Sequence, residues 1–403
     1  MTQPDHTSST NICSQTSSIH GGEPRVKSEG SVPDPIYLSS TYSFKNTDEI
    51  IDLLHGKIER HEYGRYSGPN QDSVEKKLAA LDNTEDAVLF SSGMAAVTTL
   101  ILAKVSAGDE VILFDECYHR TREFCRSHLS RFGISVVEVK TPDFSHLRQV
   151  ITKKTKLIIG ECPTNPHLSI VNPKELAEIG KEFGIETAID STLATPFNLR
   201  PCDFGVDYTI HSATKYLGGH NDLLAGNVCG AKDKLEAVRS LRGILGGVLD
   251  PGAAYRLARG LKTFSLRMTR HNENGISVAN FLNNHPKVDK IWFPGLEEHR
   301  DYSIAKDCLN GFGGLITFTV KANLHGTARF IDSLKIPKIA PSLGGCESLI
   351  EQPSILSFYH HSPEARESFG IYDNMVRISC GLEESSDLID DLRHGLEGIS
   401  NEA

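Results

Sequence analysis

Lys215 is the residue whose surroundings best suit covalent chemistry. It lies in the stretch HSATKYLGGHND, residues 211–222, which follows the extended run Asp207–Ile210. A lysine at the end of a strand, beside Ser212 and Thr214 rather than beside acids, is poorly placed for a surface ion pair. It suits a Schiff-base lysine, whose amine must be partly desolvated to act as a nucleophile at neutral pH. An ordinary exposed lysine before a turn would produce the same short pattern.

The side chains around Lys215 also suit a phosphate group. Ser212 and Thr214 carry hydroxyls that can donate to phosphate oxygens. More donors are expected at the start of the helix that follows the strand Ala87–Phe90, where N–H groups and the helix dipole favour an anion. These donors are Ser92, Gly93 and Met94. Serine at a helix start is also a common N-cap. A lysine together with phosphate donors predicts pyridoxal phosphate, a cofactor held both by a Schiff base and by a phosphate cup.

Pyridoxal phosphate makes further demands that other residues can meet. Asp190 ends the apolar run Thr187–Ile189, and a carboxylate there favours a protonated pyridine nitrogen. Tyr118 follows another expected strand and can stack on the ring. Arg377 lies in the apolar extended run Met375–Ser379 and suits bidentate binding of a substrate carboxylate. Each has a simpler alternative: a loop cap for the aspartate, an ordinary core or surface position for the tyrosine, and a structural ion pair for the arginine.

Short apolar segments alternate with helix-like segments through the first two thirds of the chain. Strands are expected at 87–90, 110–114, 134–139, 156–160, 186–189 and 207–210, and helices at 72–81, 93–102, 120–132, 144–151 and 173–183. This alternation predicts an α/β fold with a mostly parallel sheet and helices on both faces. Ligands of such sheets bind outside the carboxyl ends of the strands. The polar candidates all follow expected strands: Ser92, Tyr118, Asn165, Asp190 and Lys215.

Three parts of the chain are expected from composition and pattern. Residues 1–65 form a polar leader, flexible to about Pro33, and then an N-terminal arm that ends in a Gly- and Pro-containing loop. Residues 66–265 hold the alternating pattern and the cofactor candidates. Residues 266–403 form a smaller α/β domain, with strands near 290–293 and 314–320 and helices near 327–334 and 385–396. One long helical stretch is expected over 252–283, with the domain boundary inside it.

The composition excludes several classes of function. The formal charge of −10 and the lack of a basic run argue against nucleic-acid binding. No stretch is long and apolar enough to span a membrane. Nine cysteines are scattered without a CxxC pair, as expected of free thiols in a reducing compartment. His360 and His361 lack further ligands at zinc spacing, so a solvated loop and no metal are expected. Neither a signal core nor an Arg-rich transit peptide is visible, so we expect a cytoplasmic protein.

A series of motifs in one order resembles the Cys/Met-metabolism family of pyridoxal phosphate enzymes, which have fold type I. The resemblance covers roughly residues 34–400 and is carried by YGRYSGPN, SSGMAA, ECPTNPHLSIVN, AIDSTLATP, HSATKYLGGHND, RGLKTFSLR, PSLGGCESLIEQP and VRISCGLEE. It implies a pyridoxal phosphate-dependent transferase with an N-terminal arm and a smaller C-terminal domain. The chain departs from the family's pattern at Ser67–Asn70, Cys162 and Ser191, which leaves the cofactor chemistry intact but puts the substrate in doubt.

The resemblance implies a role for each matching residue at the cofactor. Lys215 would carry the cofactor and move protons between substrate carbons. Asp190 would pair with the pyridinium nitrogen, and Tyr118 would stack on the ring and assist proton transfer. The residues that would hold the phosphate are Ser92, Gly93, Met94, Ser212 and Thr214.

The resemblance also implies roles at the substrate and between subunits. Arg377, with Ser342 and Asn165, would hold the substrate carboxylate and the cofactor edge. Tyr63 and Arg65 would reach the cofactor phosphate of a neighbouring subunit, and Tyr63 would also meet the substrate. The active site would then exist only in a dimer, and dimers would pair into a homotetramer.

Within the family, the chain is most similar to plant-type cystathionine γ-synthases. The signs are YGRY, CYHRTR at 117–122, ILGGVLDPGAAY at 244–255 and IAPSLGGCES at 339–348. Plant-type enzymes use O-phosphohomoserine and carry a lysine where this chain has Arg120. Arginine is also a cation that suits a phosphate, although a solvated arginine in the first turn of a helix is the alternative.

We therefore expect γ-replacement, in which the thiol of cysteine displaces the γ-substituent of O-phospho- or O-acylhomoserine to give cystathionine. Two alternatives stay open. One is γ-elimination by a lyase acting on cystathionine or methionine. The other is a specialised biosynthetic γ-substitution that uses another nucleophile, or S-adenosylmethionine as the donor.

Overall fold

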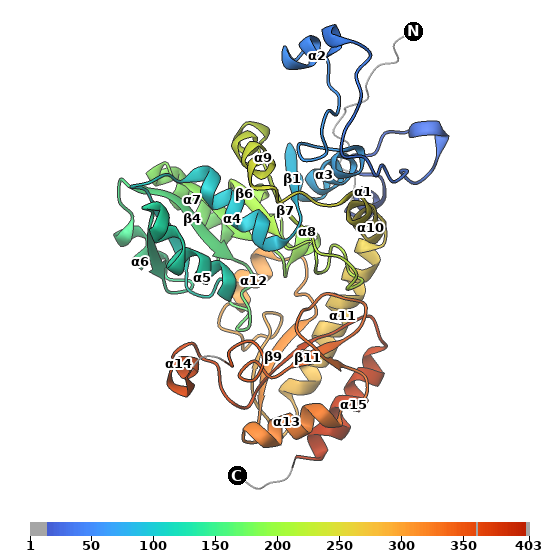
Figure 1. Ribbon diagram of the computed structural model, residues 1–403. Helices are drawn as coiled ribbons and strands as arrows, with labels where there is room; N and C mark the ends of the chain where they lie inside the picture. The colour runs from blue at the N-terminus through green and yellow to red at the C-terminus, as the bar shows by residue number, and fades with distance from the viewer. Residues whose placement is uncertain (1–13, 360–361, 400–403) are drawn as a thin grey trace.

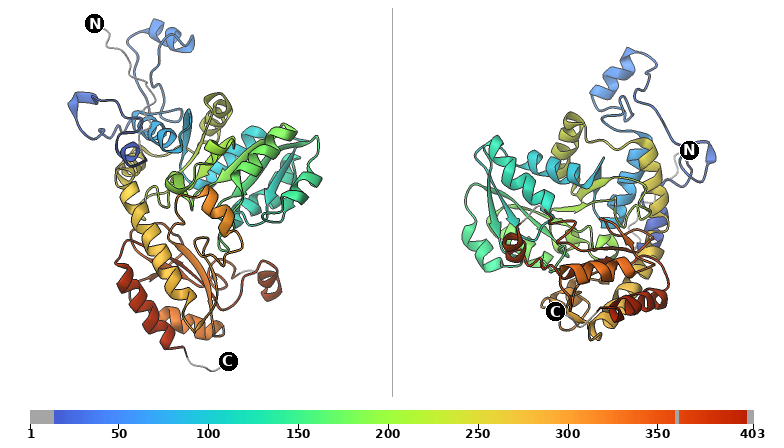
Figure 2. Two further views of the ribbon diagram at one scale, coloured as in Figure 1. Left: turned by 180° about the vertical axis from the view of Figure 1, so that it is seen from behind. Right: turned by 60° about the horizontal axis from the view of Figure 1, so that its bottom comes forward.

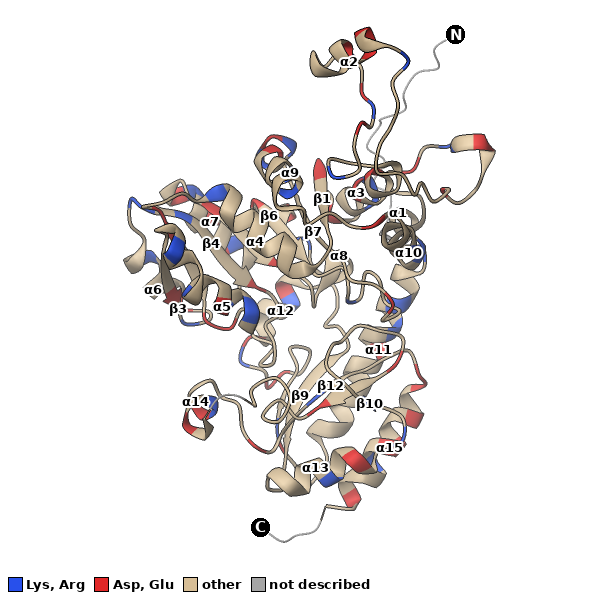
Figure 3. Ribbon diagram, viewed as in Figure 1, with Lys and Arg blue, Asp and Glu red and all other residues tan. Residues whose placement is uncertain are grey.

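The computed structural model describes residues 14–359 and 362–399, which form an α/β fold with one large and one smaller sheet (Figure 1). The expectations for Cys13, for His360 and His361 and for the start of the leader fall outside these ranges. Within them, no helix combines the length and the apolar character needed to cross a membrane. The cysteines in the same ranges are all free. Acidic and basic residues are interspersed on helices such as α9 (Lys232–Leu245) and α15 (Ser385–Glu397) (Figure 3).

The large sheet has seven strands in the order β1-β7-β6-β5-β4-β2-β3. Their bounds are β1 Asp86–Phe90, β2 Glu110–Phe114, β3 Ser135–Val139, β4 Thr155–Glu161, β5 Glu186–Asp190, β6 Tyr208–His211 and β7 Gly226–Gly230. The neighbouring strands from β3 to β6 are parallel, and β7 alone runs against its neighbours β1 and β6. The mostly parallel sheet is confirmed. The sequence analysis missed β7, whose sequence GNVCG lacks the large apolar residues of the other strands.

Helices cover both faces of this sheet, as the two orientations in Figure 2 also show. Alternate residues of β1 enter different cores: Val88 and Phe90 join the cluster that includes α4, whereas Ala87 and Leu89 join the one that includes α3. The period of two along a strand separates the two faces in this way. The helices of this part are α3 (Pro69–Asp82), α4 (Gly93–Lys104), α5 (His119–Ser127), α6 (Phe144–Val150), α7 (Pro173–Phe183) and α9. Helices α3 to α7 match the five helices expected above, except that α5 ends earlier and a 3₁₀ turn follows it at Leu129–Phe132.

The smaller sheet has the order β10-β11-β12-β9-β8 and lies in the C-terminal part of the chain. Its strands are β8 Val288–Trp292, β9 Leu315–Val320, β10 Lys338–Ile339, β11 Leu349–Glu351 and β12 Met375–Ser379. Helices α11 (Phe264–Asn283), α13 (Leu324–Ser333) and α15 pack on it around a separate apolar core. The expected strands and helices of this part are present, but β10 and β11 were too short to recognise. The domain boundary near residue 265 remains a prediction.

The helical stretch expected over 252–283 is broken into two helices, so that prediction is wrong. Helix α10 (Pro251–Leu261) ends before Lys262, and α11 starts at Phe264. The buried Arg267 stabilises the break, because its guanidinium donates to the carbonyl of Gly260 at 2.9 Å and to that of Tyr216 at 2.5 Å. The bend therefore ties the start of α11 to the loop that follows β6.

Part of the expected leader is helical and packs on the rest of the chain, and its flexibility stays a prediction. Helix α1 (Ser14–His20) packs against α3 and α11. The buried Lys77 donates to the carbonyl of Ile19 at 2.7 Å and pairs with Glu23 at 2.9 Å. Beyond this anchor, the arm with α2 (Thr47–Leu54) projects from the rest of the chain (Figure 1).

Candidate active site

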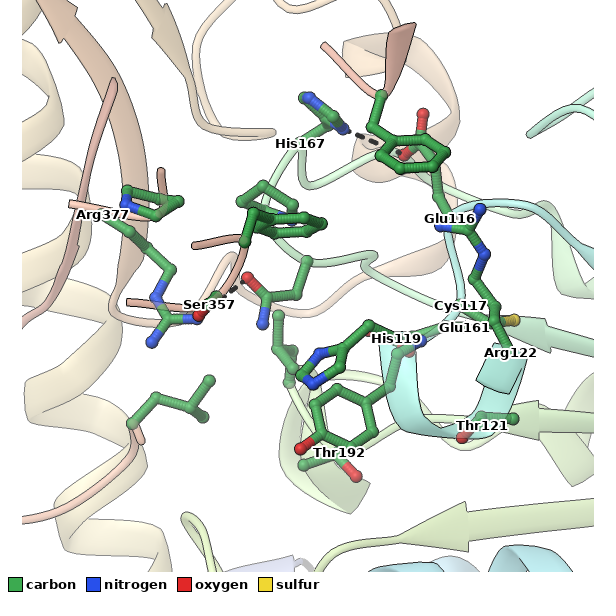
Figure 4. A pocket seen from close by; sticks show the side chains of 18 of the residues that line it. Glu116, Cys117, His119, Thr121, Arg122, Glu161, His167, Thr192, Ser357 and Arg377 are labelled. Atoms are coloured by element: carbon green, nitrogen blue, oxygen red, sulfur yellow. Dashed lines mark hydrogen bonds and ion pairs between the residues drawn. The ribbon is translucent and has the colours of Figure 1, made fainter. Parts of the chain in front are cut away.

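A cavity of about 830 Å³ lies at the carboxyl ends of the central strands, between the large sheet and loops of the C-terminal part (Figure 4). Most of the candidate residues line it, although they come from distant parts of the chain. Those residues are Ser92, Gly93, Met94, Tyr118, Asn165, Asp190, Ser212, Thr214, Lys215, Ser342 and Arg377. The fold thus brings together the chemical groups that the sequence analysis selected one at a time.

Lys215 lies in the turn after β6, with its amine directed at the C-terminal part of the chain. Its Nζ donates to Ser342 Oγ at 2.7 Å, and its backbone N–H donates to the Ser212 carbonyl at 3.1 Å. Burial and, secondarily, the positive charge of Arg377 lower the pKa of Lys215 to about 8. A sizeable fraction of this amine is therefore neutral near neutral pH, as a nucleophilic lysine requires.

Asp190 ends β5 and is held by a residue that the sequence analysis did not select. Thr192 donates to Asp190 Oδ1 from its hydroxyl at 2.5 Å and from its backbone N–H at 3.0 Å. The same hydroxyl accepts the N–H of Ser212 at 2.8 Å. Burial raises the pKa of Asp190 in spite of these hydrogen bonds. A positively charged partner would offset that burial, and a protonated pyridine nitrogen is such a partner.

The loops that carry the expected phosphate donors approach each other closely. Ser92 is the N-cap of α4, and its side chain accepts from the Ala95 N–H at 3.1 Å. A Cβ on Gly93 would lie 2.8 Å from the Cβ of Ser212, and one on Gly226 would lie 2.3 Å from the Ser92 carbonyl oxygen. Glycine at these two positions allows the helix start and the hydroxyl-bearing turn to lie against each other, an arrangement that suits an anion.

Tyr118 is the residue immediately before α5, and its side chain remains 41% exposed at the cavity. Its backbone N–H donates to Glu161 Oε2 at 2.7 Å. Burial, more than any neighbouring charge, raises the pKa of the Tyr118 phenol. The phenol is therefore neutral at physiological pH and presents a ring face and a hydroxyl to the cavity.

Arg377 lies on β12 and is almost fully buried. Its Nη1 donates to Asn165 Oδ1 at 3.2 Å and its Nη2 to the Ser342 carbonyl at 3.1 Å. Nη2 also pairs with Glu351 Oε1 at 3.1 Å. Ser342, which contacts both Arg377 and Lys215, has a backbone φ of 97°. Such a conformation costs a serine about 1–3 kcal/mol and is typical of functional sites.

Three candidate residues do not line the cavity of their own chain. Arg120 is largely exposed and pairs with Glu123 at 2.6 Å. Tyr63 and Arg65 lie at the end of the arm, where Arg65 donates to the Gly243 carbonyl at 2.6 Å. Their roles toward a neighbouring subunit and toward the substrate stay predictions.

The cavity is also lined by residues that the sequence analysis did not select, among them Arg122, Glu161, Thr192 and Glu351. Thr192 had a usable signal, because a hydroxyl residue two positions after an aspartate commonly donates back to it. Arg122 is four residues after Tyr118 and so shares its side of the helix. Glu161 and Glu351 owe their roles to contacts with distant segments, so no local pattern reveals them. Among the described residues, no group of three or more His, Cys, Asp or Glu side chains is placed to hold a metal ion.

The side chains of the cavity fit pyridoxal phosphate in each part of the molecule. A lysine with a lowered pKa suits the aldehyde, the glycine-lined helix start suits the phosphate, and the partly buried Asp190 suits the ring nitrogen. Together with a mostly parallel sheet, this set defines an α/β enzyme that carries pyridoxal phosphate on a lysine.

Comparisons identify the family within that class. The family model for the Cys/Met metabolism PLP-dependent enzymes matches residues 15–397, so the chain belongs to this family. It is 39% identical to "Cystathionine gamma-synthase 1, chloroplastic" of Arabidopsis thaliana over 384 residues, 94% of this chain and 68% of that protein. It is 37% identical to an L-methionine gamma-lyase of Fusobacterium nucleatum over 387 residues, 95% of this chain and 98% of that protein. The solved structure of cystathionine gamma-lyase from Lactobacillus plantarum superposes with a TM-score of 0.89 at 34% identity, covering 96% and 99% of the two chains.

Proposed function

We propose that the chain catalyses γ-replacement on an activated homoserine, with cysteine as the nucleophile and cystathionine as the product. The observation that carries the proposal is the convergence of Lys215, Asp190 and Arg377 on one cavity. The chain is similar to plant cystathionine gamma-synthases along 94% of its length, and this similarity supports γ-replacement as the reaction.

Pyridoxal phosphate, when bound, withdraws electrons from the substrate carbons and so makes their protons acidic. Lys215 removes and returns those protons, because its lowered pKa leaves the amine partly neutral. Asp190, oriented by Thr192, favours the protonated form of the ring nitrogen. Ser92, Gly93, Met94, Ser212 and Thr214 would hold the phosphate, and Tyr118 would contact the ring and assist proton transfer.

The substrate is oriented by the C-terminal part of the chain. Arg377 binds its α-carboxylate, with Asn165 and Ser342 holding the guanidinium in place. A phosphate ester at the γ position requires a second cation. Arg122 already lines the cavity, whereas Arg120 would have to leave Glu123 to fill this role.

We infer that the active site is shared between the subunits of a cytoplasmic homotetramer, built as a dimer of dimers. Tyr63 and Arg65 do not line the cavity of their own chain, and the arm that precedes them projects from the rest of the chain (Figure 1), as a contribution to a neighbour requires. Mixing inactive Lys215→Ala with inactive Arg65→Ala subunits tests this. Mixed dimers would regain one intact site, so activity should return to roughly a quarter of wild type by random pairing. No recovery on subunit exchange would refute a shared site.

A product assay with purified, cofactor-loaded protein tests the reaction itself. O-phospho-, O-succinyl- and O-acetylhomoserine are each offered with and without cysteine, and cystathionine is measured by mass spectrometry. Cystathionine from one ester supports the proposal, and its absence with all three refutes it.

γ-Elimination is the second candidate, favoured by the 37% identity to an L-methionine gamma-lyase along nearly the whole chain. A lyase would release a 2-oxoacid and ammonia from methionine or cystathionine. The same purified protein, assayed for both products, separates the two reactions.

A further inference from the structure

One buried carboxylate of the cavity has no assigned role. Glu351 is 2% exposed, and the β11–β12 register places it directly opposite Arg377. Its Oε1 pairs with Arg377 Nη2 at 3.1 Å and accepts from Ser357 Oγ at 3.0 Å. Its Oε2 is buried and has no hydrogen-bond partner among the described residues. Figure 4 shows Arg377 and Ser357 on one side of the cavity.

An unpartnered carboxylate oxygen that is buried in a cavity is costly, and it favours a ligand that donates a hydrogen bond. Neither cation of this corner donates to Oε2. Arg377 donates to Asn165, Ser342 and Glu351 Oε1, and Lys215 donates to Ser342 Oγ. Oε2 therefore keeps a free acceptor position for a donor on a bound molecule.

The charges around Glu351 indicate what kind of donor this is. Arg377 and Glu351 together are neutral, so a substrate carboxylate bound at Arg377 leaves this corner with a net negative charge. A second positive group would restore the balance, and buried charges require such pairing. In the proposed reaction the amino group of the homoserine derivative is engaged by the cofactor. The ammonium that remains to be bound is that of the entering cysteine.

We propose that Glu351 Oε2 binds the α-ammonium group of the thiol substrate and so selects an amino acid as the nucleophile. This inference rests on the proposed γ-replacement. It predicts that thiols without an ammonium group react poorly, although their thiol chemistry is the same.

The test compares three nucleophiles with one homoserine ester: cysteine, 3-mercaptopropionate and hydrosulfide. 3-Mercaptopropionate keeps the thiol and carboxylate of cysteine and lacks only the ammonium. In the wild type, kcat/KM for cysteine should exceed that for 3-mercaptopropionate by about tenfold or more, as one charge-assisted hydrogen bond provides. In Glu351→Gln this preference should fall about tenfold, mainly through the KM for cysteine, while the ratio of the 3-mercaptopropionate rate to the hydrosulfide rate changes by less than about threefold.

Two further variants make the comparison specific. Glu384→Gln removes an exposed glutamate that pairs with Arg270, far from the cavity, and should keep the wild-type preference. Glu351→Asp keeps the negative charge and should retain part of the preference, which covers the case in which Glu351→Gln does not fold.

The results separate this inference from the proposed function. A wild type that makes product but does not distinguish cysteine from 3-mercaptopropionate overturns the role of Glu351 and leaves γ-replacement standing. An equal fall for all three nucleophiles, with a raised KM for the ester, assigns Glu351 to the positioning of Arg377 and also overturns it. A wild type that makes no product with any nucleophile refutes γ-replacement, and the inference fails with it.

Discussion

Replacing Thr192 by valine removes one hydroxyl that connects two walls of the cofactor site. This hydroxyl donates to Asp190 Oδ1 at 2.5 Å and accepts the Ser212 N–H at 2.8 Å. Valine has nearly the same shape as threonine, and residue 192 is buried. The substitution therefore deletes two hydrogen bonds without opening a cavity.

The size of the effect follows from these two contacts. A hydrogen bond to a charged group contributes about 1.5–3 kcal/mol, and a buried N–H left without a partner costs about 1–3 kcal/mol. We expect the free energy of unfolding of the cofactor-free protein to fall by about 2–4 kcal/mol. The hydrogen bond from the Thr192 hydroxyl lowers the pKa of Asp190, so its loss raises that pKa further. Asp190 then becomes a weaker partner for a protonated pyridine. The Kd for pyridoxal phosphate should rise by about tenfold or more.

Two measurements on the cofactor-free protein check this expectation. Pyridoxal phosphate is titrated while the visible absorbance of the lysine-bound cofactor is followed, and urea unfolding gives the stability. Thr192→Ser keeps the hydroxyl and should bind the cofactor within about threefold of wild type. If Thr192→Val binds as tightly as wild type and is equally stable, Thr192 does not orient Asp190.

Three further predictions follow from the pKa shifts and buried pairs. The rate at which pyridoxal phosphate attaches to the cofactor-free protein should rise with pH and level off above about pH 8, since burial lowers the pKa of Lys215 to about 8. An ordinary lysine would instead give a rate that still rises toward pH 10. Arg377→Lys should raise the KM for the homoserine ester about tenfold or more, because an ammonium cannot reproduce the bidentate fork, whereas unchanged steady-state kinetics would remove Arg377 from substrate binding. Asp82→Asn should lower the free energy of unfolding by about 3 kcal/mol, because Asp82 pairs with the buried His211 at 3.0 Å. Burial alone would lower the pKa of His211, but Asp82 raises it overall. The pair therefore contributes most stability below the ordinary pKa of histidine, and the loss measured by urea unfolding should be larger at pH 6 than at pH 9; a loss independent of pH would contradict the ion pair.

The parallel core of the fold was predictable because its strands are short and largely apolar, as in the run VILF that ends β2. Strand β7 gave no such signal, since GNVCG is buried by its neighbours on both sides rather than by large side chains of its own. The break between α10 and α11 was also invisible. It depends on Arg267 reaching carbonyls of the loop after β6, a contact between residues far apart in the sequence.

The convergence of Lys215, Asp190 and Arg377 on one cavity was predictable, because the proposed chemistry requires one residue type at each of these positions. The site was not predictable where a residue acts through its position. Glu161 is an example: it accepts the N–H of Tyr118 at 2.7 Å. In the sequence Glu161 is only the acidic last residue of an apolar strand. Its partner is 43 residues away, so no local pattern reveals the contact.

Arg120 and Arg122 show that residue type alone does not identify which cation faces the cavity. Both are cations close to Tyr118, and either suits a phosphate by charge alone. Successive residues of a helix are rotated by about 100°, so a residue four positions after Tyr118 lies on its side and a residue two positions after it points away. The structure agrees, because Arg122 lines the cavity and contacts the ring of Phe369, whereas Arg120 pairs with Glu123 at the surface. The helical repeat therefore determines which of the two arginines faces the cavity.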